Sequence, residues 1–366
     1  MHKVTLISHD PSQSGIWRYS LALFKALRSF CKNVDLVVTP STYVKPPYLE
    51  LLKPLYGGIT YAHVRSFAVS FQQDAHIHHL LNATISGYFK LNKLIITVHD
   101  LMSFTLFKER AESWAKFGWL FNFGIQRSMR NGVYNAERVI CTSESTKRDL
   151  LRFINVDSKK IRVIYYGVDH ELFKPRDKLE ARRRLGLPLD RPIILNVGSE
   201  EPRKNIPILV KAFGILVKDV PNAMLIRVGS PTNTIKKLIH SQGLEGKIVY
   251  LRPTDEDLSL LYNASDVFVF PSYYEGLGLP LLEAMASSCR VIAGNRSAIP
   301  EAVGDGGILL DPFDVDGFAY WMHEVLSNED LRIKLSEKGY RRSLNFSWEK
   351  CARETLEVYR EVLNEV

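Results

Sequence analysis

Two glutamates that flank a glycine-containing loop are the residues of this 366-residue chain best suited to do chemistry. The stretch 271–286 reads Pro-Ser-Tyr-Tyr-Glu-Gly-Leu-Gly-Leu-Pro-Leu-Leu-Glu-Ala-Met-Ala, with Glu275 in the loop and Glu283 in a helical pattern. Pro280 suits the first turn of a helix, where its missing N–H costs nothing. The N-terminus of this helix can therefore bind phosphate through backbone amides. These amides belong to Gly276, Leu277, Gly278 and Leu279.

Glu275 and Glu283 are too far apart for a hydrolytic pair of carboxylates. Eight helical residues would separate them by about 12 Å, which exceeds the roughly 5–10 Å of such a pair. We therefore expect two separate contacts to one extended ligand, whose phosphates the helix N-terminus would bind. The alternative is a capped helix that carries two solvated glutamates.

Other candidate binding residues each follow a strand-like run. Arg203 and Lys204 suit a pyrophosphate group, because guanidinium binds phosphate oxygens bidentately and ammonium supplies a mobile charge. Gly15 opens a helical stretch and would let the backbone approach a diphosphate closely. His99 ends an apolar run and could donate a hydrogen bond to a ligand hydroxyl. The alternatives are a solvent-exposed basic pair, an ordinary strand-to-helix turn and a structural histidine.

Two Asp-x-Asp triplets raise the question of a metal site. The triplets at 255–257 and 314–316 both stand at the start of helical patterns, where carboxylates cap the N-terminus and favour the helix dipole. We therefore expect caps. The pair His78-His79 lies in a strand-like run and has no carboxylate at a spacing that suits a metal, so we expect no metal site.

Composition favours an α/β enzyme of two domains. Hydrophobic residues make up 46% of the chain and charged residues 24%, close to the globular average. The four cysteines form no close pair, so neither a disulfide framework nor a zinc knuckle is indicated. No window reaches the ~18 apolar residues of a membrane-spanning helix, and the first apolar run is too short for a signal peptide. We expect a cytoplasmic protein.

Short apolar runs alternate with helical patterns, which is typical of parallel, doubly wound sheets. In the first half the runs are 3–8, 33–38, 94–98, 138–141 and 160–164. In the second half they are 192–197, 223–228, 247–251, 266–270, 290–293 and 307–309. The pattern lapses at 165–176. We expect two Rossmann-like domains that face a cleft, residues 1–168 and 169–349, and a last helix at about 350–366 that could pack back on the first domain.

The stretch from Glu275 to Glu283 resembles the signature of glycosyltransferase family 4. Other segments resemble this family in the same order along most of the chain: 136–146, 167–169, 173–175, 197–205, 295–304 and 346–348. The resemblance implies an α/β protein of GT-B fold. It also implies retaining transfer of a hexose from a nucleoside diphosphate sugar to a hydroxyl acceptor, with the donor bound by the C-terminal domain and the acceptor by the N-terminal domain.

The resemblance also implies a role for each candidate residue. Glu283 would bind the ribose hydroxyls and Glu275 the donor sugar hydroxyls, while His99 would complete the sugar pocket. The diphosphate would be bound by Gly15, Arg203, Lys204 and the amides of 276–279. No metal or other cofactor is implied, because the cations and the helix dipole do that work. The departing phosphate oxygen would accept the acceptor's proton.

Several positions depart from the family pattern, among them Ser287-Ser288 in place of a common Cys-Gly, and four of them bear on the site. Ser14 and Ser199 stand where glycine and arginine are usual, and Arg203 could supply the charge that Ser199 lacks. Tyr166 and Leu277 stand where asparagine and phenylalanine are usual. The residues Glu-Pro-Arg-Lys-Asn resemble mannosyltransferases that use GDP-mannose, and a UDP-sugar is the other donor considered. The alternatives are a GT-B phosphorylase, an epimerase, or a non-enzymatic module that binds nucleotide-sugar.

Positive charge is concentrated in the first half of the chain. Residues 1–165 contain 22 Lys and Arg against 11 Asp and Glu, whereas the remainder contains 26 against 29. No nucleic-acid module accompanies this charge. We therefore expect a phosphate-bearing or lipid-linked saccharide acceptor, or peripheral contact with an anionic membrane through the aromatic and basic residues of 107–130. A solvated basic face is the alternative.

Overall fold

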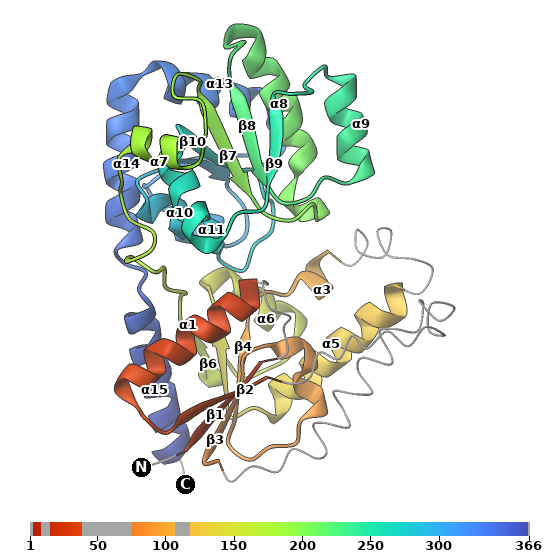
Figure 1. Cartoon of the computed structure of the whole chain (residues 1–366). Coiled ribbons are helices and arrows are strands. Elements are labelled where there is room, and N and C mark those ends of the chain that lie inside the picture. Colours follow the sequence, from red (N-terminus) through yellow and green to blue (C-terminus); the bar gives the residue numbers. More distant parts are fainter. Residues whose placement is uncertain (1–2, 9–14, 39–74, 107–117, 365–366) are drawn as a thin grey trace, which may run out of the picture. The chain divides into compact units, whose positions relative to one another are not determined.

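The computed structural model describes residues 3–8, 15–38, 75–106 and 118–364. The chain forms two compact units (Figure 1). The first comprises residues 1–166 together with 348–366, and the second comprises residues 167–347. Each division lies two residues before the boundary expected from the sequence. The last helix, α15 (Trp348–Asn364), belongs to the first unit.

The first unit contains a parallel sheet of six strands in the order β2-β1-β3-β4-β5-β6. These are β1 (Val4–Ser8), β2 (Val34–Val38), β3 (Ile77–Leu80), β4 (Leu94–Val98), β5 (Arg138–Cys141) and β6 (Ile161–Val163). Every residue of β1, β3 and β4 is buried, because both faces of a parallel sheet are covered. This explains the continuous apolar runs in the sequence.

The helices of the first unit lie between and after these strands. They are α1 (Gly15–Phe30), the 3₁₀ helix η2 (Ala83–Tyr88), α3 (Met102–Thr105), α5 (Gly118–Asn135), α6 (Glu144–Phe153), the 3₁₀ turn η3 (Ser158–Lys160) and α15. Helix α15 packs on α1. Glu361 of α15 accepts from Arg138 at 2.9 Å and from Arg162 at 2.7 Å, so two strands anchor this helix to the sheet.

The second unit contains a parallel sheet in the order β12-β11-β10-β7-β8-β9. Its strands are β7 (Ile193–Val197), β8 (Met224–Val228), β9 (Ile248–Leu251), β10 (Val267–Phe270), β11 (Arg290–Gly294) and β12 (Ile308–Leu310). When these strands are numbered within the unit, this is the 3-2-1-4-5-6 order of the Rossmann fold. The order reverses between β7 and β10, which makes the carboxyl ends of these two strands the expected ligand site.

Nine helical segments of the second unit are among the described residues. They are α7 (Lys178–Arg184), the 3₁₀ turn η4 (Pro202–Lys204), α8 (Ile206–Asp219), α9 (Asn233–Ser241), α10 (Asp255–Ala264), α11 (Leu279–Ala286), α12 (Ile299–Val303), α13 (Val315–Ser327) and α14 (Glu329–Ser343). Phe213 of α8 and Phe318 of α13 meet β7, β8 and β10 in one buried apolar core. The loops that follow the carboxyl ends of these strands therefore start from a well-packed sheet.

The two parallel sheets confirm the predicted α/β, doubly wound class. Each predicted strand is present, and its ends differ from the prediction by no more than one residue. Strand β3 lies in the strand-like run around His78 and His79, which was not counted among the predicted strands. It contains His78 and His79, whose polar side chains interrupt the apolar pattern although both are buried.

Candidate active site

The reversal of strand order in the second unit brings two loops together at the carboxyl ends of β7 and β10. These strands are neighbours, with Leu195 paired to Phe268. The loop after β7 carries Arg203 and Lys204, and the loop after β10 carries Glu275. The two loops that carry the candidate residues of the sequence therefore lie at the ligand site expected from the fold.

The loop after β7 begins at Gly198, and Gly229, directly after β8, approaches it so closely that glycine is required at position 229. Gly198 and Gly229 have φ values of +151° and +154°, which side chains rarely allow. A Cβ on Gly229 would lie 2.7 Å from the Gly198 carbonyl oxygen, and one on Gly198 would lie 3.6 Å from the Lys204 side chain. The loop then forms η4, and Asn205, with φ of +55°, leads into α8.

Glu275 binds both of the predicted phosphate ligands, and we call Arg203, Lys204 and Glu275 the charge triad. The Oε2 atom of Glu275 accepts from Arg203 Nη1 at 2.8 Å, and Oε1 accepts from Lys204 Nζ at 2.7 Å. The side chains of Glu275, Lys204 and Arg203 are 8%, 11% and 15% exposed. Arg203 Nε also donates to Glu201 at 2.7 Å, but this second carboxylate is 47% exposed. The triad is therefore a buried arrangement of two cations and one anion.

Burial and charge act in opposite directions on the charge triad. Burial raises the pKa of the Glu275 carboxyl, but Arg203 and Lys204 lower it further, so this pKa lies below its ordinary value. Burial lowers the pKa of Lys204, and the nearby Glu275 only partly offsets this effect. With both cations protonated, the triad has one net positive charge. An anion is attracted to such a charge more strongly in a partly buried site than in water.

Helix α11 begins where the second loop ends. Gly278 is the N-cap residue with φ of +101°, and a Cβ there would lie 2.9 Å from Leu281 Cδ1. Pro280 lies in the first turn, which confirms the predicted start of the helix. The side chain of Leu277 is buried, so Leu277 can contact a phosphate only through its backbone. The amides of 276–279 lie at the positive end of the helix dipole.

Glu283 lies further along α11 and is 2% exposed. Its Oε2 accepts a hydrogen bond from the hydroxyl of Tyr262, on α10, at 3.0 Å. The sequence did not point to Tyr262, because an aromatic residue within a helical pattern usually belongs to the core. Tyr262 fixes the carboxylate that we expect to bind ribose.

His99 directly follows β4 in the first unit, and both of its ring nitrogens are engaged there. Nε2 donates to the Leu81 carbonyl at 2.7 Å, and Nδ1 lies 2.6 Å from the Tyr166 hydroxyl. The carbonyl oxygen of His99 accepts from the hydroxyls of Thr142 and Thr146, at 2.9 and 3.2 Å. A hydrogen bond from the ring to a sugar would therefore have to replace one of the two ring contacts.

Gly15 is the first residue of α1 and is exposed. A Cβ at this position would meet no atom within 4 Å among the described residues. Residues 9–14, which include Ser14, lie outside the described residues. The contact of Gly15 with a diphosphate stays a prediction.

Within the described ranges, no group of three or more His, Cys, Asp or Glu side chains could hold a metal ion. Asp314 caps α13 by accepting from the Gly317 amide, as predicted. The cap of α10 is Thr254, which accepts from the Asp257 amide. The prediction of an Asp cap from the triplet 255–257 was therefore wrong; its carboxylates lie in the first turn, where they favour the helix dipole.

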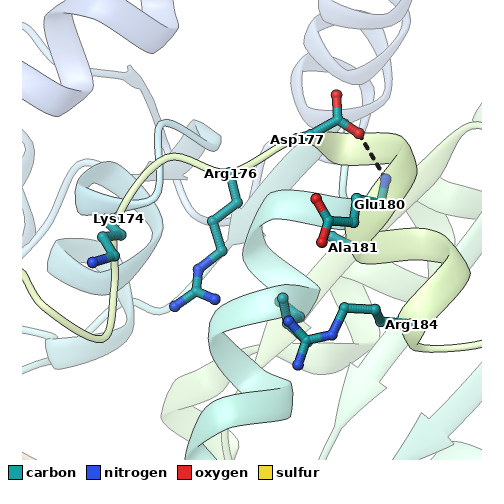
Figure 2. Close-up of a pocket in the computed structure, with 7 residues that line it drawn as sticks. Lys174, Arg176, Asp177, Glu180, Ala181 and Arg184 are labelled. Atoms are coloured by element: carbon teal, nitrogen blue, oxygen red, sulfur yellow. Dashed lines mark hydrogen bonds between the residues drawn. The ribbon is translucent and has the colours of Figure 1, made fainter.

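A separate hollow of about 310 Å³ lies beside α7 in the second unit (Figure 2). Its lining includes Lys174, Arg176 and Arg184, together with the carboxylates of Asp177 and Glu180. Asp177 accepts from the Glu180 amide at 2.7 Å and so caps α7. None of the predicted site residues lines this hollow, and its positive charge is offset by two acids.

Comparison with known proteins defines the class of the chain and then its family. Residues 44–172 match the model described as Glycosyltransferase Family 4, and residues 177–342 match Glycosyl transferases group 1. Together with the two parallel sheets, these matches define a glycosyltransferase of GT-B fold. The chain belongs to glycosyltransferase family 4, as the sequence motifs predicted.

Two relatives and one solved structure show how far the similarity extends. The chain is 28% identical to the O-antigen chain mannosyltransferase B of Escherichia coli over 74% of this chain and 71% of that protein. It is 30% identical to a D-inositol 3-phosphate glycosyltransferase of Corynebacterium kroppenstedtii over 63% of this chain, but spans only 54% of that protein. The fold matches the Anabaena protein HepE, solved with UDP and glucose, with a TM-score of 0.75 and 17% identity over 98% of this chain and 100% of that chain.

Proposed function

We propose that this glycosyltransferase transfers a hexose from a nucleoside diphosphate sugar to a hydroxyl acceptor with retention of anomeric configuration. The charge triad carries the proposal. It lies at the carboxyl ends of β7 and β10, with its two cations in the loop after β7 and Glu275 in the loop that leads into α11. A buried net positive charge and a helix N-terminus on adjoining loops suit a diphosphate, because both attract phosphate oxygens.

We propose that the charge triad and α11 bind different parts of the donor. Arg203 and Lys204 would bind the diphosphate and stabilise the negative charge that grows as the glycosidic bond breaks. The amides of 276–279 would bind the same group. Because both cations also bind Glu275, the diphosphate has to share them, and we propose that the Glu275 carboxylate contacts the sugar hydroxyls. Glu283, held by Tyr262, would bind the ribose.

The group transfer needs no separate protein base in this proposal. The bond from the anomeric carbon to the diphosphate oxygen breaks, and the acceptor oxygen bonds to that carbon from the same face. The departing diphosphate oxygen takes the acceptor's proton. We propose that His99 acts on the donor sugar, as the family resemblance implies. We also propose that the reaction is independent of divalent metal, since two cations and a helix dipole already compensate the phosphate charge.

The donor is either GDP-mannose or a UDP-sugar. A mannosyl donor is supported by the similarity to the O-antigen chain mannosyltransferase B. A UDP-sugar is supported by the fold of HepE, whose structure contains UDP and glucose. The two donors differ in base and sugar but share the diphosphate that the triad would bind. A panel of donors therefore distinguishes them without affecting the argument for the class.

The first half of the chain, which would bind the acceptor, is basic. We propose that it binds a lipid-linked saccharide at an anionic membrane surface. No helix among the described residues is both long and apolar enough to cross a membrane. On α5, Phe123 and Tyr134 are 59% and 51% exposed, and Arg127 and Arg130 between them are also exposed. Their spacing of four, three and four residues places these side chains on one helix face. The stretch 107–121 predicted to join this contact lies wholly outside the described side chains.

A donor panel tests the proposal directly. UDP-, GDP- and ADP-sugars are screened by thermal shift, and each stabilising donor is then assayed for release of nucleoside diphosphate with saccharide and inositol phosphate acceptors. The expected result is acceptor-dependent release from one donor, which Lys204→Ala abolishes without unfolding the protein. Binding without turnover on any acceptor would favour a nucleotide-sugar-binding module. Release of free nucleotide without any acceptor would favour an epimerase.

A further inference from the structure

Tyr166 is the last residue of the first unit before the chain enters the second, and its hydroxyl lies 2.6 Å from Nδ1 of His99. Both residues are 8% exposed. The opposite nitrogen, Nε2, contacts the carbonyl of Leu81 at 2.7 Å. A carbonyl can only accept, so Nε2 carries the proton. Burial disfavours the charged imidazolium, so Nδ1 is the nitrogen with the lone pair and the Tyr166 hydroxyl donates to it.

The ring of Tyr166 is held in place by two aromatic neighbours. Tyr19 of α1 lies 5.1 Å from Tyr166 and 4.9 Å from His99, measured between ring centroids. Trp348, the first residue of the unit after the chain returns, is stacked on Tyr166 at 6.5 Å with an interplanar angle of 25°. The direction of the Tyr166 hydroxyl is therefore set by packing as well as by its hydrogen bond.

We propose that Tyr166 is a positioning residue for His99. Its hydroxyl fixes the imidazole in the Nε2–H tautomer and in a single ring orientation. Without this bond the ring could exchange tautomers, and the Nδ1–H form could no longer donate to Leu81. The proposal rests on the proposed action of His99 on the donor sugar. It also gives a role to Tyr166, which departs from the family pattern.

The same unit supplies a matched pair of residues. The Nδ1 atom of His79, on β3, lies 2.7 Å from the hydroxyl of Tyr359, on α15. Its Nε2 atom lies 2.8 Å from the hydroxyl of Thr97. Both His79 and Tyr359 are buried. No role in the reaction is proposed for His79. Tyr359→Phe therefore removes the same kind of bond, from the same ring nitrogen, as Tyr166→Phe does.

Steady-state kinetics of the full chain test the proposal. In Tyr166→Phe we expect kcat to fall about tenfold, the effect of losing a hydrogen bond worth about 1.4 kcal/mol, with an unchanged KM for the donor. In Tyr359→Phe we expect kcat to change less than twofold. The melting temperatures of the two variants should fall by similar amounts, because each loses one buried hydrogen bond. Equal losses of kcat in the two variants would show that the Tyr166 hydroxyl only stabilises the fold, and would overturn the proposal.

The tautomer of His99 gives a second readout that needs no turnover. Nitrogen NMR of protein labelled at histidine is expected to show one Nε2–H form of His99 in the wild type and a mixture in Tyr166→Phe, with His79 unchanged. A single Nε2–H form in both proteins would overturn the proposal. If the wild type turns over no nucleotide-sugar, the proposed function fails, whereas the NMR result still decides whether Tyr166 fixes the ring.

Discussion

Replacing Glu275 by Gln removes the only negative charge of the charge triad while keeping the shape of the side chain. Lys204 then remains buried without the carboxylate that binds it at 2.7 Å, whereas Arg203 keeps its ion pair with the more exposed Glu201. Two consequences follow. The folded protein loses stability, because the buried ammonium of Lys204 is left without a carboxylate and Arg203 loses one of its two. The site gains positive potential, so its affinity for a diphosphate does not fall.

The loss of stability can be estimated from burial. The three side chains are 8–15% exposed, so solvent screens their interaction little. Removing one partner of a buried ion pair costs about 3–5 kcal/mol. For a unit of this size each kcal/mol lowers the melting temperature by about 2–4 °C. A loss of about 3 kcal/mol therefore lowers the melting temperature by about 6–12 °C.

Thermal unfolding with and without nucleoside diphosphate measures both effects. At 100 times its Kd a ligand stabilises the wild type by about 2.7 kcal/mol. In Glu275→Gln we expect a larger stabilisation at the same concentration. The phosphates then neutralise positive charge that Glu275 compensates in the wild type. Turnover should fall sharply, because the sugar contact is lost.

Glu201→Gln is the matched control. Glu201 binds the same arginine at 2.7 Å but is 47% exposed, so its removal should cost less than about 1 kcal/mol. Equal melting temperatures for the two variants would refute the estimate for the triad. A tenfold loss of diphosphate affinity in Glu275→Gln would refute the idea that Glu275 shares its cations with the donor.

Three further experiments test the donor site and one tests the acceptor side. Glu283→Ala should weaken nucleoside diphosphate binding by about 1.5–3 kcal/mol, whereas Glu275→Ala should mainly lower turnover; calorimetry showing equal losses of affinity would contradict this division. Because the pKa of Glu275 lies below its ordinary 4.5, stability should fall as the pH drops below about 4.5 and through the folded pKa, and Glu275→Gln should flatten this decline. Nucleoside diphosphate should bind with the same Kd with and without EDTA, and a tenfold loss on chelation would count against metal independence. The chain should sediment with anionic liposomes at low salt but not at high salt, and Arg127→Glu with Arg130→Glu should abolish this; absence of binding at low salt would leave a soluble anionic acceptor.

The strands were predictable because a parallel sheet buries every position of its central strands. The run 94–98 is apolar except for Thr97, and β4 has these same bounds. The strand-like run at β3 was not counted among the strands of the sheet, because it contains His78 and His79. Burial lowers the pKa of His79 to about 3, with His99 acting in the same direction, so this imidazole is neutral inside the sheet. A histidine read as polar in the sequence thus belongs to the core.

The backbone parts of the site were predictable for a similar reason. Gly278 and Pro280 have conformational requirements that depend on few neighbours, and they fixed the start of α11 from the sequence alone. The partners of the side chains were not predictable. Tyr262 binds a residue 21 positions away, and Tyr166 binds one 67 positions away. Such pairs depend on the packing of separate elements, and neither tyrosine is distinguished from core aromatics by its spacing.

The departure at Ser199 shows how local geometry can offset a missing charge. The family pattern has an arginine there, and its loss would remove one cation from the loop after β7. In the structure the guanidinium of Arg203, from η4, reaches the same carboxylate as Lys204. The Glu275 carboxylate binds two cations from one 3₁₀ turn and so keeps them close to each other. A diphosphate could then contact both cations at once. We therefore propose that Arg203 supplies the charge that Ser199 lacks and that Glu275 holds the guanidinium in place.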